Sequence, residues 1–141
     1  MPPDPPRVLL RKAQDDERLA LLAAGNATIS DEQIGFLAQQ AVEKSIKAVL
    51  SLHGVRYRRT HDLTELIDLL RANGIDYPAA MDDCVALTPF AAEMRYDYLP
   101  PEDESDVSFD RAGALRLVRT TLEWAQGVIV SGIDELPSME T

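Results

Sequence analysis

Apolar residues recur along most of the chain at intervals of three and four, which is the spacing of one face of an α-helix. The pattern is strongest between Ser30 and Gly54, where the apolar stripe is too wide to be covered by a single neighbouring helix. Stretches of alternating β-branched residues, which are typical of strands, are scarce. The sequence therefore predicts an all-α protein in which the helix between these two residues is central.

Capping and helix-breaking residues mark the ends of this central helix and of a shorter helix that follows it. Ser30 and Gln33 have the spacing of a capping box, and a glycine follows the last predicted turn. Asp62 and Glu65 repeat the capping-box spacing before a short, one-sided helix. We expect this second helix to stop at the Asn-Gly pair of residues 73–74.

Two further helices are predicted near the ends of the chain. The first starts after the proline cluster of residues 2–6 and runs to about Ala24. The last starts with Ser108 as its N-cap and ends at Gly132. We expect the central helix and this last helix to form the core together. The side chains predicted to be buried there are Val42, Ile46, Val49, Leu115, Leu122 and Ala125.

A fourth helical region is predicted from Pro78 to about Arg95. We expect a kink or a restart at Pro89, because proline has no amide hydrogen to donate and clashes with the preceding turn. Four to five amphipathic helices with short connections indicate an up-down antiparallel helical bundle. A length of 141 residues suits one domain, so residues 1–141 are assigned to a single domain.

The charge of the chain limits what it can bind. It carries 14 lysines and arginines against 24 aspartates and glutamates, a net charge of -10, which disfavours a general attraction to nucleic acid or anionic lipid. Much of the acidity lies in an expected exposed loop at about residues 97–107 and an expected flexible tail at about residues 133–141. The basic residues concentrate between His53 and His61. A phosphate site must therefore be local.

Composition also bears on metals and on the cellular compartment. One cysteine, Cys84, and two histidines are too few for a disulfide framework or a structural zinc centre, and neither a metal nor another cofactor is predicted. No stretch approaches the ~20 apolar residues of a membrane span, and the first residues lack the pattern of a signal peptide. The sequence thus predicts a cytoplasmic protein without a membrane partner.

Three motifs follow one another along the chain. The first is QQAVEKSIKA at residues 39–48, the second is THDL at residues 60–63, and the third is the Arg95-Tyr96 pair. In order and spacing they resemble the HEPN family, the higher eukaryotes and prokaryotes nucleotide-binding domain. The stretch KAQDDERLA at residues 12–20 is similar to the first helix of that family, so the resemblance covers nearly the whole chain.

The resemblance implies a helical bundle that pairs as a homodimer, and it leaves two functions open. One is a nucleotide-binding subunit that partners a small nucleotidyltransferase in a two-component, toxin-antitoxin-like module. The other is an endoribonuclease that cleaves RNA without a metal ion. The first function is that of a binding subunit and the second that of an enzyme.

The ribonuclease members of the family resemble one another in an arginine separated by four to six residues from a histidine. Arg56 and His61, with four residues between them, are therefore the catalytic candidates. Cleavage without metal needs a base for the 2′-hydroxyl proton and a cation for the charge that develops on the phosphate. The match departs from the family pattern at Tyr57, and it precedes a helix instead of lying within a later one. In the structural alternative, His61 donates a hydrogen bond to backbone or to a carboxylate and orients the following helix.

A second set of candidates would bind the phosphate of a nucleotide in a groove shared by the start of the third helix and its neighbours. We expect the backbone amides after Asp62 to add to the positive field there. In the structural alternative, the lysines of the set pair with Asp15 or Asp16 on the first helix or with Glu43. The arginines of residues 58–59 then pair with the acidic loop of residues 102–106 or with carboxylates of the other subunit, and the pair at residues 95–96 caps the fourth helix. The candidates are Lys44, Lys47, Arg58, Arg59, Arg95 and Tyr96.

Overall fold

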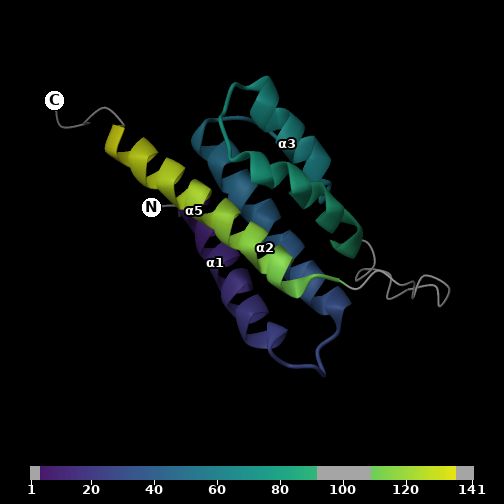
Figure 1. Ribbon diagram of the computed structural model, residues 1–141. Helices are drawn as coiled ribbons and strands as arrows, with labels where there is room; N and C mark the ends of the chain where they lie inside the picture. The colour runs from purple at the N-terminus through teal and green to yellow at the C-terminus, as the bar shows by residue number, and fades with distance from the viewer. Residues whose placement is uncertain (1–3, 92–108, 136–141) are drawn as a thin grey trace.

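The computed structural model describes residues 4–91 and 109–135 of the chain, and every regular element in these ranges is helical (Figure 1). This confirms the all-α helical bundle. In Figure 1, α1 and α3 lie on opposite sides of α2, and α5 crosses in front of it. The elements are the α-helices α1 (Pro5–Ala24), α2 (Asp31–Leu52), α3 (Leu63–Ala72) and α5 (Arg111–Glu135) and the 3-10 helix η1 (Ala79–Leu87).

The core surrounds α2, which packs against α1, α5, α3 and η1. Its residues Val42, Ile46 and Val49 are fully buried, as predicted. Because the stripe of α2 reaches around most of the helix, it needs all four of these neighbours.

The buried face of α5 differs from the predicted one at its first turns. Leu122 and Ala125 are fully buried as expected, but Leu115 is only half-buried and Ala114 takes its place in the core. At about 100° per residue, Leu115 lies about 60° around the helix from Val118, and Thr121 lies about as far on the other side. Thr121 is fully buried. The face that meets the core is therefore turned toward Thr121 and away from Leu115.

The ends of α2 and α3 follow the capping residues of the sequence. Ser30 Oγ accepts a hydrogen bond from the Gln33 amide at 3.2 Å, and the Ser30 amide donates to the Gln33 side chain at 3.3 Å, which confirms the capping box. Gly54 and Gly74 follow the two helices with φ angles of 69° and 68°, a left-handed conformation that glycine adopts without strain. Asp62 caps α3, as its place in the sequence predicts.

Two helix boundaries differ from the prediction near prolines. α1 begins at Pro5, inside the proline cluster, because the first turn of a helix needs no amide donors. The region after Pro78 forms the 3-10 helix η1 and becomes α-helical only at Thr88, so Pro89 stands in the first turn of an α-helical stretch that the structure describes as far as Ala91. The restart at Pro89 is thus confirmed, whereas the predicted end near Arg95 lies outside the described residues.

The last helix also has different ends. Asp110 Oδ1 accepts a hydrogen bond from the Gly113 amide at 2.9 Å, which is the contact of an N-cap. The predicted cap, Ser108, lies outside the described residues. α5 continues through Gly132 to Glu135, so the predicted stop at Gly132 is wrong. A glycine inside a helix costs about 1 kcal/mol relative to alanine and does not by itself end the helix.

Arg111, in the first turn of α5, fastens this helix to the connection between α1 and α2. Its Nε atom lies 2.7 Å from Asp31 Oδ1, and Nη1 donates to the carbonyls of Ala24 at 3.0 Å and Asn26 at 3.3 Å. Nη2 donates to the carbonyl of Ile29. One guanidinium group therefore satisfies the end of α1, the loop after it and the start of α2.

Phe90 packs on the first half of α2 at Gly35, and Phe109 packs on Phe90. Their rings meet edge to face with centroids 5.0 Å apart. The Phe90 ring lies so close to Gly35 that a Cβ atom at this glycine would come within 2.5 Å of it. The small size of Gly35 therefore allows the Phe90 ring to approach α2.

Across residues 4–91 and 109–135, no helix is both long enough and apolar enough to cross a bilayer.

Candidate functional site

Three polar side chains, spaced four residues apart, run along one face of α2. They are Gln39, Glu43 and Lys47, and Glu43 is the central one with only 4% of its surface exposed. Glu43 Oε1 accepts a hydrogen bond from Gln39 Nε2 at 2.8 Å, and Oε2 accepts one from Lys47 Nζ at 3.0 Å. A buried carboxylate needs such partners, because an unpaired charge in the core is strongly unfavourable.

The same side chains hold the segment that leads into α3. After Gly54 the chain turns back along α2, so that the Thr60 carbonyl accepts from Lys47 Nζ at 2.9 Å and the His61 carbonyl accepts from Gln39 Nε2 at 3.1 Å. Lys47 Nζ also lies 5.5 Å from the centre of the Tyr57 ring, within cation-π range. The polar face of α2 thus sets the path of this segment.

His61 completes the network around Glu43. Its Nδ1 atom lies 2.8 Å from Glu43 Oε1. This is the contact with a carboxylate that the structural interpretation of His61 predicts. The side chain remains 42% exposed, so the ring has an inner edge against Glu43 and an outer edge toward the surface. A role of His61 in proton transfer stays a prediction.

Several candidate cations have acidic partners. Lys44 Nζ lies 2.6 Å from Asp16 on α1, which confirms the expected pairing with the first helix. Arg58 Nε lies 2.5 Å from Glu65. This hydrogen bond raises the pKa of Arg58 and lowers the pKa of the Glu65 carboxyl. The Glu65 carboxylate therefore pairs with Arg58 and does not complete a capping box with Asp62.

Two candidate arginines differ from the others. Arg56 and Arg59 are exposed, and neither forms an ion pair with any residue in the described ranges 4–91 and 109–131. Arg95 and Tyr96 lie outside the described residues. The structure thus brings Lys47 and His61 together around Glu43 and leaves Arg56 and Arg59 on the outer side of the same segment.

The backbone amides at the start of α3 already have acceptors. The Asp62 amide donates to Thr60 Oγ1 at 3.0 Å, and the Thr64 amide donates to Asp62 Oδ1 at 2.9 Å. The Leu63 amide donates to Thr88 Oγ1 at 3.1 Å. Side-chain oxygens therefore occupy these three amides, and a contribution of the start of α3 to the field of the arginines stays a prediction.

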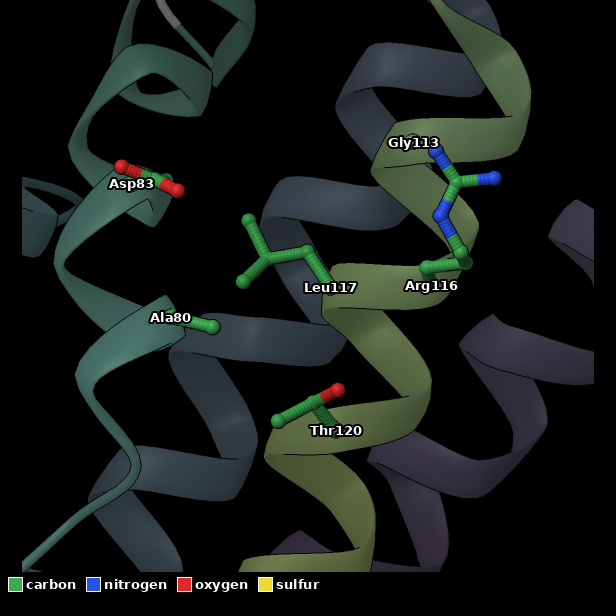
Figure 2. A pocket seen from close by; sticks show the side chains of 6 residues that line it. All are labelled: Ala80, Asp83, Gly113, Arg116, Leu117 and Thr120. Carbon is green, nitrogen blue, oxygen red and sulfur yellow. The ribbon is translucent and has the colours of Figure 1, made fainter.

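A separate pocket of about 310 Å³ lies between η1 and α5 (Figure 2). In Figure 2, Leu117 and Thr120 point across it toward Ala80, while Arg116 projects along α5 away from Asp83. The charged groups at its rim do not converge on one point, and the pocket contains none of the candidate residues. The pocket is lined by Ala80, Asp83, Gly113, Arg116, Leu117 and Thr120.

Sequence reasoning missed two members of the network. Gln39 and Glu43 both belong to the motif at residues 39–48, and Glu43 is the expected partner of Lys47, but neither is among the predicted site residues. The available signal was three polar residues four positions apart on a helix whose other buried positions, apart from Ser45, carry no polar side chain. No three histidine, cysteine, aspartate or glutamate side chains gather into a metal site within the part of the chain that the structure describes.

Comparison with protein families bears directly on this arrangement. The family model of the HEPN domain matches residues 7–127. The chain belongs to the HEPN domain family. The match extends from α1 into α5, so it contains α2 with its polar face and the start of α3. No curated protein and no solved structure matches the chain significantly.

Proposed function

We propose that this HEPN domain protein binds a nucleotide through the segment from Val55 to His61, with Arg56 and Arg59 on the phosphate. HEPN domains are of a nucleotide-binding or ribonuclease type. Arg56 and Arg59 carry the proposal, because they are exposed cations without an acidic partner among the described residues of a chain with net charge -10. A guanidinium group binds phosphate oxygens with two parallel hydrogen bonds.

The anchoring of this segment supports binding. Lys47 and Gln39 hold the carbonyls of Thr60 and His61 in place. A backbone fixed before the ligand arrives loses less conformational entropy on binding. Lys47 and Arg58 neutralise their own carboxylates, so Glu43 and Glu65 oppose a phosphate less strongly than they otherwise would.

We also propose the biological setting that the family resemblance implies. The protein is a homodimeric, cytoplasmic subunit of a two-component, toxin-antitoxin-like module, and its protein partner is a small nucleotidyltransferase. Co-expression with a nucleotidyltransferase from the same genomic neighbourhood tests this directly. A stable complex on size exclusion supports the partner, and separate elution of the two proteins contradicts it.

Binding is tested by titrating the purified protein with ATP, AMP and a short RNA in buffer that contains a chelator. The double variant R56A/R59A is compared with R7A/R116A, which removes the same charge from exposed arginines outside the segment. We expect the first variant to weaken binding by about tenfold or more, since one charge-assisted hydrogen bond contributes roughly 1.5–3 kcal/mol. Equal affinities of the two double variants would contradict the proposal.

The hydrogen bond between Glu43 and His61 favours a second candidate function, endonucleolytic cleavage of RNA without metal. The outer nitrogen of His61 would take the proton of a 2′-hydroxyl, and the 2′-oxygen would attack the adjacent phosphorus. Arg56 would stabilise the charge on the phosphate oxygens, and the 5′-oxygen would leave as a hydroxyl by taking a proton from a water molecule, while His61 would return its proton to solvent. The products would be a 2′,3′-cyclic phosphate and a 5′-hydroxyl end.

Cleavage is measured on the same sample as binding, with a fluorescent RNA and chelator present. Products that disappear in both Arg56→Ala and His61→Ala, and that do not form from a 2′-deoxy substrate, indicate the ribonuclease. Nucleotide binding without any cleavage supports the binding subunit alone.

A further inference from the structure

Glu43 lies in the core next to His61, and its carboxylate contacts one nitrogen of the His61 ring. The carboxylate is 4% exposed, and its Oε1 atom lies 2.8 Å from His61 Nδ1. Gln39 donates a hydrogen bond to Oε1, and Lys47 donates one to Oε2. With donors on both oxygens, the carboxylate acts only as an acceptor. The hydrogen of this contact therefore sits on Nδ1 of His61.

The position of that hydrogen decides what the outer edge of the ring can do. When the neutral imidazole carries its hydrogen on Nδ1, Nε2 has a lone pair and accepts a hydrogen bond. The His61 ring is 42% exposed and its Nδ1 edge is buried against Glu43, so Nε2 is the nitrogen available to a ligand. An acceptor pairs with a hydroxyl group and not with a phosphate oxygen.

We propose that Glu43 is a positioning residue that fixes the tautomer of His61 so that Nε2 accepts a hydrogen bond from a ribose hydroxyl. The ligand class is then a ribonucleotide, whose hydroxyl meets His61 while its phosphate meets Arg56 and Arg59. This inference rests on the proposed nucleotide-binding function, because that function brings a ligand to His61. It adds the preference for ribose over deoxyribose and the residue that enforces it.

Three residues, Gln39, Lys47 and Asp62, keep the arrangement rigid. Gln39 Nε2 donates both to Glu43 and to the His61 carbonyl, so one amide group orients the carboxylate and the backbone below the ring. Lys47 Nζ likewise donates both to Glu43 and to the Thr60 carbonyl. The cap residue Asp62 starts α3 immediately afterwards. The ring thus has a fixed backbone on one side and a fixed acceptor on the other.

The chain has a matched internal control. It contains two histidines, and the Nδ1 atom of the other, His53, lies 3.0 Å from the Val49 carbonyl. A carbonyl only accepts, so His53 also carries its hydrogen on Nδ1. Glu43 is not a partner of this ring among the described residues. A change at Glu43 is therefore expected to alter His61 and to leave His53 as it was.

The tautomers are read from long-range proton-nitrogen spectra of the 15N-labelled full chain at alkaline pH. We expect both histidines of the wild-type protein to show the Nδ1-H pattern. In Glu43→Ala, His61 is expected to shift toward the Nε2-H pattern that an unconstrained imidazole favours, with His53 unchanged. A wild-type His61 in the Nε2-H form, or a His61 pattern that the variant does not alter, overturns the proposal.

A second variant keeps the test decisive if Glu43→Ala does not fold. In His61→Asn the amide nitrogen takes the place of Nδ1 and continues to donate to Glu43, while the Nε2 acceptor is removed. We expect its melting temperature to stay close to that of the wild type. The wild type is expected to bind AMP about tenfold more tightly than 2′-deoxy-AMP, as for one hydrogen bond, and the variant is expected to bind both alike.

The outcomes separate the two proposals. If the wild type binds AMP and 2′-deoxy-AMP equally through Arg56 and Arg59, the role of His61 is overturned and the nucleotide-binding function stands. If neither nucleotide binds, the nucleotide-binding function fails and the ribose preference fails with it. The tautomer measurement still decides in that case whether Glu43 sets the form of His61.

Discussion

Replacing Arg111 by alanine is expected to lower the free energy of unfolding by about 3 kcal/mol, as judged from its lost contacts. The guanidinium group contacts one carboxylate, Asp31, and the carbonyls of Ala24, Asn26 and Ile29. The side chain is 23% exposed, so water replaces only part of these contacts after truncation. Ala24 ends α1 and the other two carbonyls lie in the following loop, where that of Asn26 also accepts a hydrogen bond from the Ile29 amide at 3.1 Å.

The magnitude follows from the kind of contact that is lost. A hydrogen bond from a charged donor contributes roughly 1.5–3 kcal/mol when it is well shielded, and an exposed ion pair contributes about 0–1 kcal/mol. Asp31 is 44% exposed, so its pairing belongs to the weaker kind. If each of the three hydrogen bonds to a carbonyl contributes about half of the shielded value, their sum is about 3 kcal/mol. In Arg111→Lys, a single ammonium group cannot reach all four acceptors, and we expect about half of the loss.

The assay is urea denaturation followed by circular dichroism, with Arg116→Ala as the control. Arg116 lies on the same helix, is 74% exposed, and has its nearest carboxylate partner, in Asp110, at 3.9 Å. Its truncation is expected to change stability by less than about 0.5 kcal/mol. If Arg111→Ala stays within that range of the wild type, or if Arg111→Lys is as stable as the wild type, the guanidinium contacts do not stabilise the fold as inferred.

Ile46→Ala is expected to cost roughly 2–5 kcal/mol in urea denaturation, because the side chain is fully buried at the centre of α2, and a cost below about 1 kcal/mol would contradict that packing. Gly35→Ala is expected to lower the melting temperature, because its Cβ would come within 2.5 Å of the Phe90 ring. Gly127 has open space around it, so Gly127→Ala is expected to raise the free energy of unfolding by up to about 1 kcal/mol. Equal effects of the two substitutions would refute the close approach at Gly35. Burial raises the pKa of the Cys84 thiol to about 12, so a thiol reagent at pH 8 is expected to label it no faster than the chain unfolds. A faster reaction at pH 8 would show that the thiol is accessible. Because the thiol of the unfolded chain has a pKa nearer the ordinary value of 9.0, the free energy of unfolding is expected to fall as the pH rises from about 9 toward 12.

The candidate site was predictable in part because its motifs are short. Residues 39–48 and 60–63 carry Glu43, Lys47 and His61, and local spacing already places Lys47 one helical turn from Glu43. That His61 reaches the same carboxylate depends on how the chain folds back after Gly54, over 18 residues of separation. Periodicity within one helix contains no information about this return.

The order of the helices and the ends of α2 and α3 were decided by the sequence itself. Ser30, Asp62 and the glycines after α2 and α3 act through hydrogen bonds and φ angles within a few residues, so their effect does not depend on the rest of the fold. The same holds for the apolar period that buries Ile46. These features, together with the motifs of the HEPN family, are local properties that one sequence is enough to reveal.

Only the tertiary structure decided which polar groups meet between elements. Whether Ala114 or Leu115 faces the core depends on the rotation of α5 about its axis relative to α2. The spacing of apolar residues determines this rotation only to within about one residue, or about 100°. Thr88 reaches the amide of Leu63 only because the α-helical stretch after η1 packs beside the start of α3. In the same way, the acceptors of Arg111 lie about 80 residues away in the chain. Such contacts follow from the docking of whole helices, and docking is set by the summed burial of their faces and not by any local pattern.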